Sequence, residues 1–116
     1  MATVMEVASL VLSLLTPDER AHCVAYALDD AVPAGTTIAA APIPVIAPSA
    51  AYIAFIDREP LANWGHAARY LIVDKKTATV TAVDARFPPF RAGNASKWHV
   101  IYRAPGVPDT AVAAPR

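Results

Sequence analysis

The chain has 116 residues, of which 55% are hydrophobic and 17% are charged. This length suits one domain with a single core, and the composition lies far from that of disordered chains. Ten basic and ten acidic side chains give a formal net charge of zero, so the sequence carries no electrostatic footprint for nucleic acid. We expect no nucleic-acid partner. The high apolar content indicates instead that a second copy or another protein covers part of the surface.

Several features favour a soluble, cytoplasmic protein. The apolar N-terminal stretch carries Glu6 and lacks the basic region of a secretory signal. Prolines interrupt the apolar region 31–56, which argues against a membrane-spanning helix. The single cysteine, Cys23, excludes an internal disulfide and fits a reducing compartment.

Two helices are predicted at the N-terminal end. Residues 3–15 confine their polar side chains to one narrow stripe, so this helix is apolar over most of its surface and needs cover on two sides. The segment TPDE at residues 16–19 has the pattern of a capping box with proline at the first helical position. We expect this second helix to run to about Asp30, where Pro33 and Gly35 follow.

Four strands are predicted after the helices, over residues 52–57, 67–74, 79–85 and 97–103. The segment 36–49 contains a proline every few positions and is therefore expected as an extended edge rather than a central strand. Residues 74–78 form a predicted hairpin turn, in which a left-handed Ala78 would cost about 1 kcal/mol relative to glycine. Alternation in the last strand predicts Trp98, Val100 and Tyr102 on one face.

Together these elements predict an α+β domain over residues 1–104. Both helices should pack on one face of a four-stranded, mostly antiparallel meander sheet, with the proline-rich segment along an edge. Residues 105–116 are expected to form a disordered tail.

The connection between the first two predicted strands is the most suggestive segment for a site. If these strands form a hairpin, Asp57 and His66 approach one another, and the carboxylate could orient the imidazole for proton transfer. The alternative, which we favour, is structural: Trp64 plugs the end of the core while the polar side chains bind loop backbone.

Arginines near the strand ends suggest a different kind of site. Together with Trp64 and Tyr70, Arg58 and Arg69 could line a pocket or groove for a small molecule, an anion or a peptide. The favoured alternative is a set of solvated arginines paired with nearby carboxylates.

Two short segments, HCVAYA at residues 22–27 and GHAA at residues 65–68, resemble the cysteine and histidine segments of papain-like, cysteine- and histidine-dependent amidohydrolases. The resemblance implies a hydrolase or acyl transferase with Cys23 as nucleophile, His66 as base and Asp84 as the orienting group. In that family the cysteine begins a helix, whose dipole lowers its pKa, whereas the cap at Thr16 places Cys23 two turns into the predicted helix. A buried core thiol is the favoured interpretation.

No metal or cofactor is expected. His22, His66 and His99 lack the close paired spacings of zinc sites, and the four glycines form no phosphate-binding loop. The leading hypothesis is thus a small non-enzymatic binding module that self-associates or docks on another protein. A cysteine-dependent hydrolase or acyl transferase and a ligand pocket around Trp64 and His66 are the alternatives.

Overall fold

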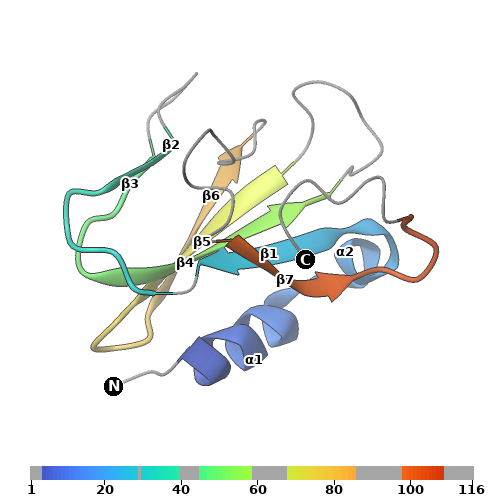
Figure 1. The fold of residues 1–116 in the computed structure, drawn as a ribbon, viewed down its shortest axis with the longest axis horizontal. Coiled ribbons are helices and arrows are strands. Elements are labelled where there is room, and N and C mark those ends of the chain that lie inside the picture. Colours follow the sequence, from blue (N-terminus) through green and yellow to red (C-terminus); the bar gives the residue numbers. More distant parts are fainter. Residues whose placement is uncertain (1–3, 29, 40–44, 59–67, 86–97, 109–116) are drawn as a thin grey trace.

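The main element is a five-stranded antiparallel sheet with strand order β6-β5-β4-β1-β7 (Figure 1). The computed structural model describes residues 4–28, 30–39, 45–58, 68–85 and 98–108. The strands of this sheet are β1 (Val24–Leu28), β4 (Ala51–Asp57), β5 (Ala68–Asp74), β6 (Val80–Ala85) and β7 (Trp98–Arg103). One helix covers one face of the sheet, so the predicted α+β class is confirmed.

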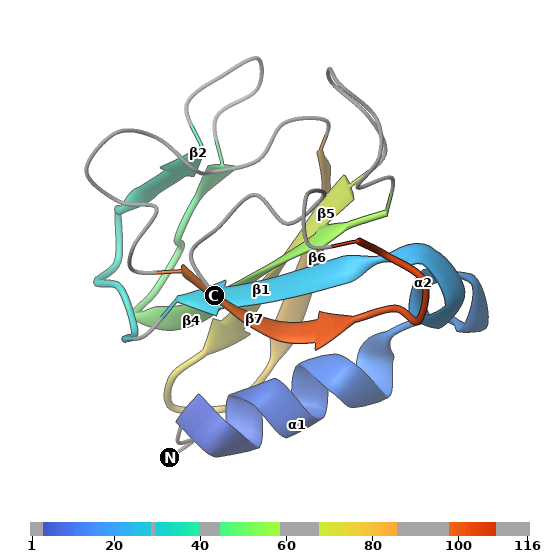
Figure 2. The same ribbon diagram turned by 45° about the vertical axis from the view of Figure 1, so that its right-hand side comes forward.

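The first helix, α1 (Val4–Leu14), confirms the prediction for the N-terminal segment. It lies along one face of the sheet (Figure 2), where Val7, Val11 and Leu15 are buried. Leu10 and Leu12 pack partly against the same core, whereas Leu14 is 38% exposed. The sheet therefore covers one side of this helix.

The second helix, α2 (Pro17–His22), begins at the predicted cap but ends much earlier than expected. Cys23 is its C-cap residue, in an extended conformation, and β1 starts at Val24. The helical prediction for residues 23–28 was wrong because β1 lies between β4 and β7 and is buried on both faces. Such a strand is apolar throughout and lacks the alternation that distinguishes a half-exposed strand from a helix.

The sheet accordingly has five strands rather than four, and the meander holds only for β4, β5 and β6. The last strand crosses to the opposite edge and pairs with β1, the strand that the sequence did not predict. A register shift between Ala25 and Tyr26 breaks the alternation along β7, so Val100 lies opposite Tyr26 while Tyr102 lies opposite Ala25. Tyr102 is thus on the helix face, contrary to the prediction that it shares a face with Trp98.

The proline-rich segment folds back on itself instead of extending the edge of the main sheet. Within it, β2 (Thr37–Ala39) and β3 (Val45–Ile46) pair as a separate two-stranded sheet, and residues 40–44 lie outside the described part. Val45 belongs to the core on the face opposite α1, so β2 and β3 cover that face (Figure 2).

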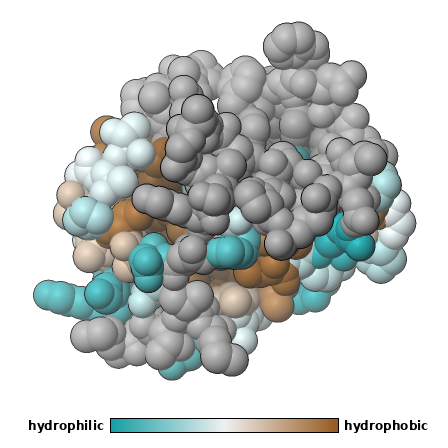
Figure 3. Space-filling view, viewed as in Figure 1, coloured by the Kyte–Doolittle hydropathy of each residue, from teal (hydrophilic) through white to brown (hydrophobic). Residues whose placement is uncertain are grey.

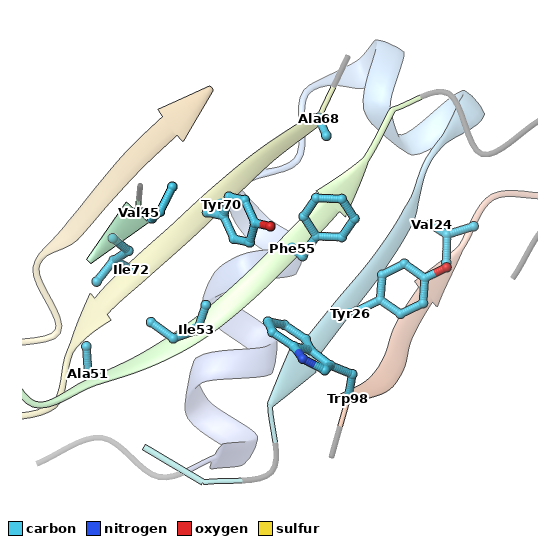
Figure 4. Packing of buried hydrophobic residues seen from close by; sticks show 10 residues of the cluster. All are labelled: Val24, Tyr26, Val45, Ala51, Ile53, Phe55, Ala68, Tyr70, Ile72 and Trp98. Atoms are coloured by element: carbon cyan, nitrogen blue, oxygen red, sulfur yellow. The ribbon is translucent and has the colours of Figure 1, made fainter. Parts of the chain in front are cut away.

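The sheet buries side chains on both faces. On the helix face, α1 packs against small and aliphatic residues, including Ala54, Ile56 and Leu71. The other face is aromatic: Figure 4 shows Phe55 between Tyr70 and Tyr26, with Trp98 nearby. The ring centroid of Phe55 lies 5.0 Å from that of Tyr70 and 6.1 Å from that of Tyr26, within the range of favourable aromatic pairs.

The predictions of a disordered tail and of no membrane-spanning helix concern parts of the chain that the structure describes only in part. The predicted tail is described only to Pro108, where Val107 N–H donates to Ala104 O at 3.1 Å. In the described ranges, neither helix has the length and apolarity needed to cross a membrane.

The turn between β5 and β6 forms as predicted, around the carboxylate of Asp74. Oδ1 accepts the N–H groups of Lys76 and Thr77 at 2.8 and 3.0 Å, while Oδ2 accepts the Ser49 hydroxyl at 2.6 Å. The Ser49 bond, followed by the two N–H bonds, lowers the pKa of Asp74 to about 2. Ala78 closes the turn with φ of +60°, the left-handed conformation that disfavours a Cβ.

The strain at Ala78 predicts that Ala78→Gly stabilises the fold by up to about 1 kcal/mol, because glycine adopts a positive φ freely. Urea unfolding would measure this change as a higher midpoint at constant slope. The matched control is Ala82→Gly in β6, where φ is not positive; there glycine should destabilise by about 0.5–1 kcal/mol. Equal effects of the two substitutions would contradict the assignment.

Candidate functional site

A buried carboxylate, Glu19, lies where α1, α2 and the sheet meet. Its side chain is only 2% exposed, which is rare for a glutamate without charged partners. The predicted capping box places it there: Thr16 Oγ1 accepts the N–H of Glu19 at 3.0 Å, and Glu19 Oε1 accepts the N–H of Thr16 at 2.9 Å. This exchange turns the glutamate side chain back towards the start of its own helix.

Two arginines from the sheet converge on the same carboxylate, and we call Glu19, Arg58 and Arg69 the Glu19 cluster. Arg58 Nε and Arg69 Nε both donate to Oε2, each at 2.8 Å. Arg69 Nη2 donates to Oε1 at 2.7 Å, which makes this pair bidentate. With the N–H of Thr16, the carboxylate receives four hydrogen bonds, which fills its acceptor capacity.

Strand alternation explains why both arginines reach this point. Arg69 of β5 lies opposite Ile56 of β4, and Ile56 belongs to the helix face. Arg58 follows the end of β4 two positions after Ile56, so it lies on the same face. Asp84 of β6 lies opposite Arg69 in register and is exposed, which places its carboxylate on this face as well.

The cluster also binds the C-terminal end of α1, where backbone carbonyls lack helical partners. Arg69 Nη2 donates to Leu14 O at 3.0 Å. Arg20 Nη2 donates to Leu12 O, and the Tyr102 hydroxyl donates to Arg20 O. Arg69 and Arg20 thereby join β5 and α2 to the end of α1, and Tyr102 joins β7 to α2.

Glu19 remains ionised over a wide pH range despite its burial. Desolvation by itself would raise its pKa, but the hydrogen bonds from Arg69, Thr16 and Arg58 outweigh that effect and lower the pKa below its ordinary value. An ionised glutamate with all acceptor positions filled is poorly suited to proton transfer. The arrangement instead fits a structural link between helices and sheet.

Cys23, the predicted nucleophile, is fully buried beside this cluster. Its N–H donates to Glu19 O at 2.7 Å, and its side chain belongs to the core under α1. Burial, followed by the negative charges of Glu19 and Asp57, raises the pKa of the Cys23 thiol to about 12. It lacks both the exposure and the depressed pKa that a reactive cysteine requires.

The other predicted site residues that the structure describes lie on opposite faces of the sheet. Asp57 is buried and lies on the aromatic face by alternation with Phe55. Tyr70 is buried in the aromatic cluster (Figure 4), whereas its neighbour Arg69 lies on the helix face. A single pocket would therefore not hold both side chains.

The connection that suggested an imidazole site lies outside the described residues. The pairing of β4 with β5 confirms the hairpin, and Asp57 lies opposite Ala68 at its end. Trp64 and His66 belong to residues 59–67, which the structure does not describe. The predictions that involve these two side chains stay predictions.

Sequence reasoning missed the role of Glu19. It assigned the glutamate only to the capping box and paired Arg58 and Arg69 with other carboxylates or with solvent. The sequence did predict where the Glu19 side chain lies relative to Thr16, because the capping box fixes that position. Its arginine partners lie 39 and 50 residues away, and no local pattern indicates that separation.

A different surface feature is the outer edge of the sheet at β6. All six of its residues pair with β5 without a register shift. It contains no proline or lysine, and its single charge is Asp84. Thr81 and Ala82 are exposed. The opposite edge, β7, is disrupted by the register shift and carries the exposed Arg103; bulges and charges of this kind protect an edge from further pairing.

The hydrogen-bond pattern shows which backbone groups of β6 point away from the sheet. Asp74 N–H donates to Thr79 O at 2.9 Å, and residues along an antiparallel strand bond to alternate neighbours. Thr81, Val83 and Ala85 therefore bond to β5. The N–H and C=O groups of Val80, Ala82 and Asp84 point outward, and no described strand pairs with them.

The chain matches no known protein-family model, and comparison with curated proteins and with solved structures finds no significant similarity. Among the described residues, no group of three or more histidine, cysteine, aspartate or glutamate side chains is placed to hold a metal ion.

The Glu19 cluster predicts that Glu19→Gln destabilises the fold by about 2 kcal/mol at neutral pH, because two partly buried guanidinium groups lose their countercharge. Urea unfolding would measure the loss. Asp18→Asn is the matched control, since its side chain is 88% exposed, and it should change stability by less than about 0.5 kcal/mol.

The same pair of variants has an expected pH dependence. The folded pKa of Glu19 is lowered, so its contribution is complete above the unfolded value of about 4.3 and disappears as pH falls through the folded pKa. The difference between wild type and Glu19→Gln should therefore shrink below about pH 4. A difference that is independent of pH would show that the Glu19 charge contributes nothing.

Burial of Cys23 predicts that iodoacetamide labels the folded protein very slowly. The pKa rise from 9.0 to about 12 reduces the thiolate population about a thousandfold at pH 8. Mass spectrometry would follow alkylation with and without denaturant, and Thr77→Cys, at an exposed turn position, supplies a reactive control thiol. Rapid labelling of Cys23 in the folded state would revive the hydrolase hypothesis.

Proposed function

We propose that this protein is a non-enzymatic binding module that accepts an extended segment of another chain along the β6 edge. The observation that carries the proposal is the regular edge at β6, which no described strand covers and whose outward backbone groups belong to Val80, Ala82 and Asp84. Strand addition uses such groups for affinity and the flanking side chains for specificity. Natural sheets usually block an edge of this kind unless it is used.

The composition of the surface around this edge supports a protein partner. Val80 and Val83 are half-buried at the sheet margin, and Ala82 between them is small and exposed. An added strand would cover these apolar atoms while its backbone pairs with β6. On the face shown in Figure 3, apolar areas of the described residues emerge beside hydrophilic ones.

The surfaces that the sequence indicated contribute less to this proposal. The inward residues of α1 are already buried against the sheet, and the central prolines of the proline-rich segment lie outside the described residues. The alternative of a cysteine-dependent hydrolase or acyl transferase gains no support, because Cys23 is buried and its pKa is raised.

The test is selection of peptides from a displayed library against the wild-type protein and two variants. Ala82→Pro removes an outward N–H without removing a bond to β5, and proline is tolerated at an edge strand. Ala82→Ser keeps the N–H and serves as the control. Peptides selected on the wild type should bind Ala82→Ser equally and Ala82→Pro about tenfold more weakly or worse.

Hydrogen exchange would locate the bound peptide. In the free protein, the amides of Val80, Ala82 and Asp84 should exchange faster than those of Thr81 and Val83, and a bound strand should slow only the first set. Protection elsewhere, or peptides that bind Ala82→Pro as well as the wild type, would overturn the proposal.

A further inference from the structure

We infer that the segment that β6 accepts is the β6 strand of a second copy, which would join two sheets into one continuous sheet across a two-fold axis. This inference rests on the proposed function and names its partner. A two-fold interface brings the same surface of both copies together, so that surface must complement itself. The outward backbone groups of β6 recur at every second residue, which makes such pairing possible.

Symmetry and alternation restrict how two β6 strands pair. Only an antiparallel arrangement about an axis perpendicular to the sheet keeps α1 on the same side in both copies. Outward residues must then lie opposite outward residues. Placing the axis at Ala82 opposes Ala82 to itself and Val80 to Asp84 of the second copy, so the whole outward set is used.

Charge argues against a register whose axis lies at Asp84. An axis at Asp84 would oppose two like charges, which destabilises a cross-strand pair. With the axis at Ala82, each Asp84 faces a valine and keeps Arg69 of its own chain as a cross-strand neighbour. The formal net charge of zero also lets two copies approach without net repulsion.

The side chains near the axis permit a close approach. Ala82 is small and exposed, so its methyl group does not separate the strands. Thr81 would lie opposite Val83 of the second copy on the other face, a pairing of two β-branched residues that suits a sheet. A contact limited to this edge is smaller than the interface of a stable dimer, and we therefore expect dimerisation that depends on concentration in the micromolar range or above.

Sedimentation velocity and cysteine cross-linking test the inference. Wild type and Ala82→Ser should form a dimer with rising concentration, and Ala82→Pro should weaken it about tenfold or more. Under mild oxidation, Ala82→Cys should form a disulfide-linked dimer, because opposed Cα atoms in a hydrogen-bonded pair lie about 5.5 Å apart. Asp84→Cys is the matched control on the same edge and face, and it should cross-link far less, since its counterpart lies several residues away.

The outcomes are distinguishable. A wild type that stays monomeric would overturn the proposed dimer. Asp84→Cys that cross-links as readily as Ala82→Cys would overturn the proposed register. If circular dichroism shows that Ala82→Pro is unfolded, the cross-linking of Ala82→Cys compared with Asp84→Cys tests the dimer instead. A monomeric protein that still selects strand peptides at β6 keeps the binding function and loses this partner, whereas a protein with neither property loses both.

Discussion

The fold depends on one buried ionic contact, in which Glu19 receives hydrogen bonds from Arg58 and Arg69. A buried carboxylate is costly to desolvate, so it persists only when every acceptor position is filled. Here a local capping box fills one position and the sheet fills the rest. The contact fixes where α2 meets the sheet, and through Leu14 O it fixes the end of α1.

This contact also accounts for two of the polar residues at the strand ends, Arg58 and Arg69. The guanidinium groups that could bind an anionic ligand are directed towards Glu19, and the thiol beside them is buried with a raised pKa. Every buried side-chain nitrogen or oxygen among the described residues has a hydrogen-bond partner. Satisfied polar networks of this kind rigidify a core and specify a single structure.

The two faces of the sheet are both packed, but its two edges differ in regularity and charge. Both faces bury apolar side chains, under α1 on one side and with Val45 of β3 on the other. At the edges, β7 is irregular and charged, whereas β6 is regular and nearly uncharged. Since an unpaired strand presents backbone donors and acceptors in a fixed order, the function proposed for this protein concerns backbone pairing more than side-chain chemistry.

Local signals in the sequence determined the α+β class, the span of α1, the cap at Thr16, the β4–β5 hairpin and the turn at residues 74–78, because each depends on neighbouring residues. Only the tertiary structure decided that residues 24–28 form a central strand, since burial on both faces removes the alternation that identifies a strand. It likewise decided the partners of Glu19 and the outward direction of the Ala82 backbone. Those features arise from contacts between distant segments, which no local spacing records.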